Sequence, residues 1–356
     1  MRKLLFLSVF LIIACKSDHK QKQKPTAEIP QKRTAFSEVE VEELLKDDSL
    51  NVRAIEVIGK NLAFAGSNGK YGLYNSSTGK WKTNTQTYDS QKPEFRAVAS
   101  TANDFFMLSA GNPALLYKTG DNGEMKLVYE ENGEKVFYDS MAFWNDQEGI
   151  AMGDSMEGCL SVIITRDGGA TWKKLDCAAL PHAYEGEAAF AASNSNIAIV
   201  GEKTWIISGG VKSRIFFSPD KGQNWEVLAL PLVEGKETTG PYSIAFYDEK
   251  NGFVIGGDYT KPEENSANKA VTSDGGQSWQ LVADGEDPGY KSSVRYVPNA
   301  DAQELVAVGF TGISYSHDGG KNWKELSKEG FYTLRFVDDS TAFAAGKGKI
   351  AKLHFR

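Results

Sequence analysis

A turn motif that recurs four times in one frame is the feature that most constrains this chain. Each copy places Thr or Ser first, Asp two residues later, Gly two residues after the Asp, and Trp three residues after the Gly. The Asp and Trp positions are Asp167 and Trp172, Asp220 and Trp225, Asp274 and Trp279, and Asp318 and Trp323. Repetition of this kind predicts a fold assembled from similar supersecondary units.

Two predicted strands, separated by a break of small residues, precede each turn. Seven such units can be traced, and their second strands end at Ala65-Gly66, Ala110-Gly111, Met152-Gly153, Val200-Gly201, Gly256-Gly257, Val308-Gly309 and Ala345-Gly346. The last four turn Trp residues are 44 to 54 residues apart, which suits a four-stranded blade. Trp81 holds the same position in the first unit, and Met125 holds it in the second.

A single four-stranded sheet with two apolar faces cannot stand alone, so the units must pack around a common axis. The seventh unit stops at KIAKLHFR, one strand short, whereas FSEVEVEELL near residue 40 resembles an outer strand without a unit before it. We therefore predict an all-β, seven-bladed β-propeller of four-stranded antiparallel blades over residues 36–356, with the N-terminal strand completing the last blade. Six or eight blades are the alternatives if a weak unit is misphased.

The N-terminus predicts export. Arg2 and Lys3 precede the apolar run LLFLSVFLIIA, which is too short for a membrane-spanning helix. Ile12-Ile13-Ala14-Cys15 resembles a bacterial lipobox, so we expect a signal peptide at 1–14 and a lipidated Cys15 at the start of a polar tether at 15–35. This places the protein on a bacterial membrane, at the periplasmic side or the cell surface. A plain secretory signal is the alternative.

Charge and cysteine content add further limits. The net charge of −7 argues against nucleic acid as a general partner. We expect membrane contact through the N-terminal lipid only, and a monomer. Cys159 and Cys177 flank the first DGG turn, so a hairpin would bring their sulfurs together, and export would permit a disulfide. Two free thiols are the alternative.

The repeated turn residues are interpreted as structural. The Asp carboxylate can accept hydrogen bonds from turn amides, the Gly permits positive φ, and the Trp can pack between blades. One carboxylate per turn offers too few oxygen ligands for calcium. With four histidines and no CxxC pair, the sequence predicts no metal and no cofactor.

The turn frame resembles the Asp-box, or bacterial neuraminidase repeat. Phrases such as MAFWNDQEGIAMGD and ITRDGGATWKKL resemble the photosystem II assembly and stability factor-like family of bacterial envelope propellers, over about residues 38–356. The resemblance implies a seven-bladed propeller outside the cytoplasm that binds partners through an arginine-bearing face. Sialidases share the Asp-box, but their F/Y-R-I-P motif is only half matched by Phe95-Arg96-Ala97-Val98.

A binding face follows from the predicted topology. The DGG turns share one face of the propeller, and the longer irregular loops share the other, where recognition is usual. Arg53, Arg96, Arg295 and Arg335 hold what we take as one equivalent position in units that are consecutive around a closed ring. Such an arc can hold a carboxylate, sulfate or phosphate, or an acidic peptide. Packing against blade carboxylates is the alternative. Trp205 and Tyr184, in irregular stretches, are further predicted ligand contacts.

Two functions remain open from the sequence. The first is a non-enzymatic, envelope-anchored scaffold for binding or assembly that recognises a protein or an anionic glycan. The alternative is a sialidase-like glycoside hydrolase acting on acidic sugars, with Asp154 and Asp258 in the acid and base roles.

Overall fold

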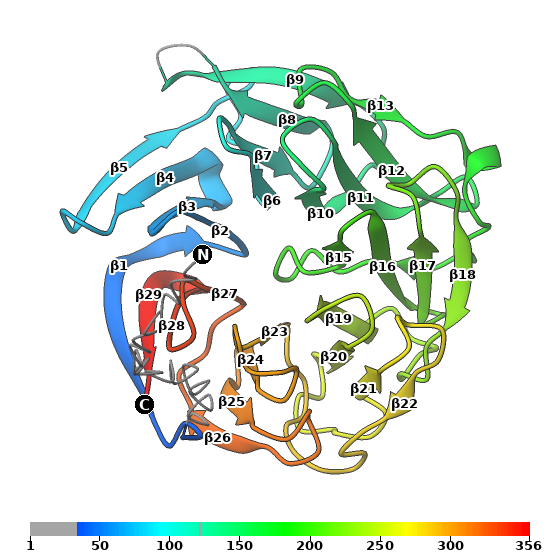
Figure 1. The fold of residues 1–356 in the computed structure, drawn as a ribbon. Helices are drawn as coiled ribbons and strands as arrows, with labels where there is room; N and C mark the ends of the chain where they lie inside the picture. The colour runs from blue at the N-terminus through cyan, green and yellow to red at the C-terminus, as the bar shows by residue number, and fades with distance from the viewer. Residues whose placement is uncertain (1–33, 121–122) are drawn as a thin grey trace, which may run out of the picture. The chain divides into compact units, whose positions relative to one another are not determined.

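The computed structural model describes residues 34–120 and 123–356, of which Ala35–Arg356 form one compact unit. The predicted signal peptide, Cys15 and nearly all of the tether lie outside the described residues. Within the unit, seven antiparallel sheets stand around a common axis (Figure 1). The predicted seven-bladed β-propeller is confirmed. No helix in the described part of the chain is long and apolar enough to cross a membrane.

In blades 1 to 6 the four blade strands follow sequence order from the axis outward, whereas in blade 7 the N-terminal strand lies outermost. Blade 1 comprises β2 (Ala54–Ile58), β3 (Asn61–Ala65), β4 (Lys70–Asn75) and β5 (Lys80–Thr85), with the short 3-10 turn η1 (Ser67–Gly69) between β3 and β4. Blade 2 comprises β6 (Phe95–Ser100), β7 (Phe105–Ser109), β8 (Ala114–Thr119) and β9 (Met125–Glu131). Blade 3 comprises β10 (Tyr138–Phe143), β11 (Gly149–Met156), β12 (Cys159–Thr165) and β13 (Lys173–Lys174).

The remaining blades follow the same plan. Blade 4 comprises β15 (Ile197–Val200), β16 (Lys203–Gly210), β17 (Arg214–Ser218) and β18 (Glu226–Ala229), with β14 (Glu187–Ala188) beside β16. Blade 5 comprises β19 (Thr239–Phe246), β20 (Gly252–Asp258), β21 (Lys269–Thr272) and β22 (Gln280–Leu281). Blade 6 comprises β23 (Ser293–Tyr296), β24 (Leu305–Gly309), β25 (Gly312–Ser316) and β26 (Lys324–Ser327). Blade 7 comprises β27 (Thr333–Phe336), β28 (Thr341–Ala345), β29 (Lys347–Phe355) and β1 (Val39–Asn51).

The ring closes through the two ends of the unit. Strand β1 pairs with β29 from Val39 opposite Phe355 to Asn51 opposite Lys347, with two register shifts between (Figure 1). The pairing gives the last blade its fourth strand, as the one-strand deficit in the sequence predicted. The pairing covers the free edge of β29 and leaves β1 as the outer edge strand of blade 7.

The Asp-box turns are held by local hydrogen bonds. In blade 5, the Oδ1 atom of Asp274 accepts from the Ser278 amide at 3.0 Å and from the Thr272 hydroxyl at 2.7 Å. The Ser278 hydroxyl also donates to the Asp274 carboxylate at 2.6 Å, and this bond together with the other two lowers the pKa of Asp274 to about 2. Gly276 has a φ of +87°, and a Cβ there would lie 2.9 Å from the indole of Trp205. The turn therefore needs this Gly for both its conformation and its close packing.

The turn Trp residues pack between blades. The Trp172 ring meets Phe143 edge-on at 5.7 Å and Phe106 of blade 2 at 6.4 Å. Trp323 lies 5.8 Å from Phe253 of blade 5 in the same way. Each Trp thus joins its own blade to the preceding one and buries apolar surface on both.

Blade 4 departs from the prediction. We expected Val200-Gly201 to end its second strand. Instead, β15 is the inner strand, Val200-Gly201 enters the hairpin to β16, and β16 runs without interruption to Gly210. Several small-residue pairs in this unit fit the repeat pattern, so the pattern alone did not fix the phase. Residues 189–196, called the plug segment below, consequently leave the sheet.

The disulfide and Trp205 also depend on local strand geometry. Cys159 and Cys177 are joined with their Cα atoms 5.5 Å apart, although Cys177 lies in the 3-10 turn η3 (Cys177–Ala179) and not in the second strand of a hairpin. Trp205 lies fully buried in β16, stacked on Phe246 at 3.8 Å. Its predicted ligand contact is wrong, because the stretch that we took for a loop is a continuous strand.

Candidate binding site

The plug segment crosses the centre of the ring, where Figure 1 shows a loop beside β15 reaching toward the axis. Asn194 connects it to two blades: its amide nitrogen donates to the Val98 carbonyl at 2.7 Å, and its amide oxygen accepts from the Met141 amide at 2.9 Å. The Ser193 hydroxyl donates to the Ser292 carbonyl at 2.6 Å, and the Ser193 carbonyl accepts from the Thr333 hydroxyl at 2.9 Å. The plug segment is therefore bonded to blades 2, 3, 6 and 7.

The strand registers divide the predicted arginine arc. Ala54, Ser293 and Thr333 each pair with the residue that precedes the Gly of the small-residue break. Arg53 comes one residue before that level, whereas Arg295 and Arg335 come two residues after it. The four arginines therefore do not share one level. The sequence alignment that suggested one level is wrong, because it matched arginines rather than strand pairs.

Arg295 and Arg335 hold the plug segment. One terminal nitrogen of Arg335 donates to the Asn194 carbonyl at 2.8 Å, and the other donates to the Leu334 carbonyl at 2.8 Å. Arg295 donates to the Ser195 hydroxyl at 3.0 Å. Burial lowers the pKa of Arg335 to about 10, so the guanidinium stays charged at neutral pH. Through these contacts both arginines stabilise the position of the plug segment.

Arg53 and Arg96 instead line a cavity of about 390 Å³, called the rim pocket below. The Arg53 guanidinium stacks on the Tyr332 ring at 4.1 Å, and no residue in the described ranges forms an ion pair or hydrogen bond with it. Arg96 donates to the Glu94 carboxylate at 3.2 Å and to the plug carbonyl of Ala191 at 3.3 Å. Arg53 is thus the guanidinium most available to an anion.

Aromatic side chains form the walls of the rim pocket. The lining residues with rings are Phe137, Phe190, Tyr259, Tyr290, Phe310 and Tyr332. Behind them, Tyr242 stacks on Phe190 at 3.9 Å and meets Tyr290 edge-on at 4.8 Å. Tyr259 and Phe310 are 47% and 43% exposed, unusual values for large apolar rings. Rigid rings beside a cation are the composition of a recognition surface.

Two carboxyl groups lie beside the plug segment. The Asp154 carboxylate accepts from the Ala189 amide at 2.9 Å, and burial raises its pKa to about 6. Asp139 is fully buried, and neither of its oxygens has a hydrogen-bond partner among the described residues. Burial and the nearby Asp154 raise the pKa of Asp139 well above its usual range. Burial without a partner therefore favours the protonated form of Asp139.

The two carboxylates of the hydrolase interpretation do not line the rim pocket. Asp258 accepts from the amide and the hydroxyl of Thr260, at 3.0 and 2.6 Å, and these hydrogen bonds keep its pKa low although burial opposes them. Asp258 thereby stabilises the turn after β20, while Asp154 accepts a hydrogen bond from the plug segment. The structure thus assigns each a separate local role.

Tyr184 lies on the surface, 48% exposed, with its ring 4.7 Å from the guanidinium of Arg214. It lines a second cavity of about 350 Å³ together with His182. Arg214 is itself bound to the buried Glu187, whose carboxylate also accepts from the Ser208 hydroxyl. Tyr184 is therefore separate from the residues that line the rim pocket. No cluster of three or more His, Cys, Asp or Glu residues suited to a metal occurs in the described ranges.

Sequence reasoning missed the plug segment and most of the aromatic wall. The run Ser193-Asn194-Ser195-Asn196 is a signal that could have located the plug, since four small polar residues between apolar stretches rarely form an inner strand. Phe310 and Tyr332 gave no comparable signal, because each is a single ring at the end of an otherwise ordinary strand.

The closed ring and its turns define a seven-bladed β-propeller with Asp-box repeats. A family model for the BNR/Asp-box repeat matches residues 314–325. No curated protein matches the sequence.

Solved structures resemble the chain in fold. YCF48 bound to D1 peptide has a TM-score of 0.63 at 13% identity, covering 92% of this chain and 100% of that one. The WD40 repeats of RRP9 reach 0.64 at 12%, covering 91% and 99%. The GH74 xyloglucanase from Xanthomonas campestris reaches 0.64 at 13%, covering 88% of this chain but only 53% of the enzyme. Identities this low concern the fold alone.

Proposed function

We propose that this propeller is a non-enzymatic binding scaffold that recognises an acidic segment of a protein at the rim pocket. The observation that carries the proposal is Arg53, a guanidinium without an anionic partner in the described structure, set among exposed aromatic rings. A carboxylate of the partner would pair with Arg53 and Arg96, while Tyr259 and Phe310 would cover the adjoining side chains.

The comparisons agree with this choice of partner. YCF48, a propeller of similar fold, has been solved with a bound peptide, so the architecture can present a peptide site. We further propose that the chain is exported and held on a membrane by a lipid attached to Cys15. Proteins of the cell envelope would then be able to reach the rim pocket. An anionic glycan is the alternative ligand for the two arginines.

Photo-crosslinking from Tyr259 in intact cells, followed by identification of the captured protein, tests the proposal. An acidic peptide from that partner should then bind the purified protein, and Arg53→Ala should weaken binding at least tenfold, mainly by faster dissociation. Arg166→Ala is the matched control, because Arg166 belongs to an Asp-box turn and pairs with Glu148. It should leave binding unchanged.

Three results would contradict the proposal. Equal binding by Arg53→Ala and the parent protein would remove the rim pocket from recognition. Tighter binding of acidic oligosaccharides than of peptides would favour a glycan ligand. Hydrolysis of such an oligosaccharide, abolished by Asp154→Ala, would establish the hydrolase alternative.

A further inference from the structure

The interface between blades 1 and 2 lacks the packing that seals other interfaces. At two other interfaces, the turn Trp of one blade meets a large ring on the second strand of the preceding blade: Trp172 meets Phe106 and Trp323 meets Phe253. At this interface Met125 takes the Trp position, opposite Thr119 at the start of β9. The second strand of blade 1 presents Ala63 to blade 2. Two bulky groups are therefore replaced by smaller ones.

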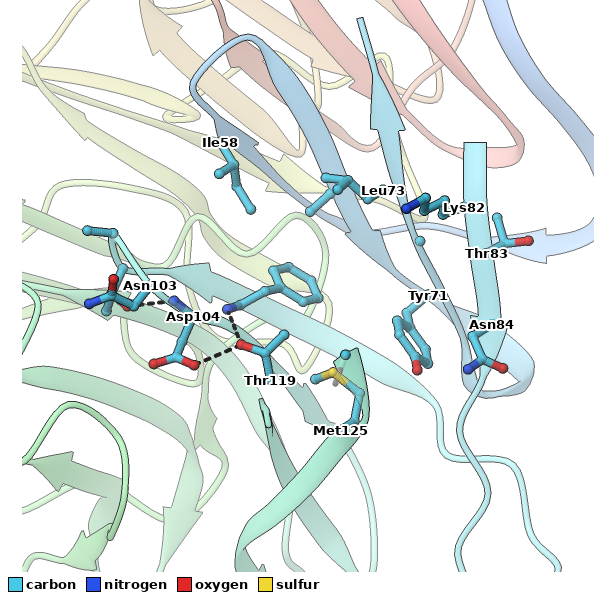
Figure 2. A pocket seen from close by; sticks show the side chains of 16 residues that line it. Ile58, Tyr71, Leu73, Lys82, Thr83, Asn84, Asn103, Asp104, Thr119 and Met125 are labelled. Atoms are coloured by element: carbon cyan, nitrogen blue, oxygen red, sulfur yellow. Dashed lines mark hydrogen bonds between the residues drawn. The ribbon is translucent and has the colours of Figure 1, made fainter. Parts of the chain in front are cut away.

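A cavity of about 520 Å³ occupies the space that these replacements leave (Figure 2). Its apolar lining comprises Ile58, Ala63, Tyr71, Leu73, Phe105 and Met125. Leu73 is 38% exposed, which further indicates that blade 2 does not fully cover this face of blade 1. The volume lies within the range of about 300 to 1,000 Å³ that small-molecule sites occupy in proteins.

Charged groups at the cavity favour an anion. Lys82, on β5, lines the cavity beside Leu73 (Figure 2), and no residue in the described part of the chain forms an ion pair or hydrogen bond with its ammonium group. The acidic lining residue Asp104 is already engaged, because it pairs with Lys118 at 3.0 Å and accepts from the Thr119 hydroxyl at 2.9 Å. The Lys82 ammonium group thus lies beside the apolar part of the cavity, and the Asp104 carboxylate nearby is already neutralised by Lys118.

We propose that the cavity between blades 1 and 2 binds a free long-chain carboxylate, with the alkyl chain against Ala63 and Met125 and the head group paired with Lys82. An alkyl chain suits the largely apolar lining, and its burial supplies most of the binding free energy. The Lys82 ammonium adds selectivity for an anionic head group. This site is independent of the rim pocket and of its partner.

Titration of the full chain with oleate, below the concentration at which oleate forms micelles, tests the proposal. Ala63→Phe restores the ring that Phe106 and Phe253 supply elsewhere, and it should weaken oleate binding at least tenfold without lowering Tm. Lys82→Ala should weaken oleate severalfold but leave oleyl alcohol unchanged. Arg53→Ala is the control from the rim pocket and should bind oleate normally, which separates this site from the proposed peptide function.

The absence of oleate binding by the parent protein would overturn the proposal. Equal binding by parent and Ala63→Phe would do so too. If Ala63→Phe fails to fold, Met125→Trp fills the same cavity from the opposite blade and should also block oleate. Equal losses of oleate and oleyl alcohol in Lys82→Ala would exclude the assigned head-group contact.

Discussion

The Asp-box turns and the plug segment use aspartate in opposite ways. In the turns, Asp167, Asp220, Asp274 and Asp318 each accept several hydrogen bonds, and the pKa of each carboxyl is lowered. Beside the plug segment, burial raises the pKa values of Asp139 and Asp154. The same residue type is thus stabilised in its charged form in a repeated surface turn, whereas at the hub burial favours its protonated form.

The difference also concerns distance along the chain. The donors to a turn Asp lie within four residues of it, as Ser278 does for Asp274. Asn194 lies 53 residues from Met141, 96 from Val98 and 141 from Arg335, all of which contact it. The turns are therefore local features repeated around the ring, whereas the plug segment depends on the ring being closed.

Asn194→Ala should have the largest effect on stability. The substitution leaves the buried Met141 amide and Val98 carbonyl without their partners, so we expect the free energy of unfolding to fall by about 3 kcal/mol. Urea unfolding measures it. The control is Asn224→Ala, whose amide serves an exposed turn and should cost less than about 1 kcal/mol. Equal losses would mean that the plug segment contributes no more than a turn.

The pH dependence of stability should differ in sign between the two regions. The folded-state pKa of Asp154, about 6, lies above the usual 3.8, so its stabilising contribution is complete below pH 3.8 and is lost as pH rises through 6. The loss is about 2 to 3 kcal/mol at most. Asp154→Asn should therefore weaken the decline in Tm between pH 4 and 7.

Asp274→Asn is the matched comparison for that measurement. The pKa of Asp274, about 2, lies below 3.8, so its stabilising contribution is present above pH 3.8 and is lost as pH falls through 2. Between pH 5 and 7 this variant should follow the parent protein. Parallel curves for Asp154→Asn and the parent would show that Asp154 titrates normally.

Replacing a single turn carboxylate should have a moderate effect. Asp318→Ala removes the acceptor for the amides of Lys321 and Asn322, and we expect a loss of about 1 kcal/mol because the turn is exposed to water. Combining it with Asp167→Ala should double the loss, since the turns lie in different blades and share no partner. Thermal unfolding checks both values. A much larger combined loss would indicate that the turns cooperate.

Arg53→Ala should change stability least. Among residues 34–120 and 123–356, its guanidinium has only the Tyr332 ring as a partner, so we expect a loss of about 0.5 kcal/mol. Arg335→Ala should cost about 2 kcal/mol, because its side chain binds the plug segment. Chemical denaturation measures the loss of stability in both variants and so distinguishes an arginine that serves ligand binding from one that stabilises the fold. Similar losses of stability would contradict the separate roles assigned to Arg53 and Arg335.

Sequence reasoning predicted the parts of the fold that repeat. The frame around Asp167, Asp220, Asp274 and Asp318 identified the turns, and the missing last strand identified β1 as the partner of β29. The phase of blade 4 was wrong, since several small-residue pairs fit the repeat equally well. The candidate site was only partly predicted: Arg53 and Arg96 line the rim pocket, whereas Arg295 and Arg335 lie at another level.

By itself, the sequence determined that the chain forms seven similar sheets, because hydrogen bonds within a turn and alternation along a strand act between residues close in the chain. The tertiary structure alone decided which side chains meet at the hub. Asn194 finds Val98 and Arg335 finds Asn194 only after the blades have closed around the plug segment. Such contacts depend on the register of separate blades, and a shift of one residue turns a side chain to the opposite face.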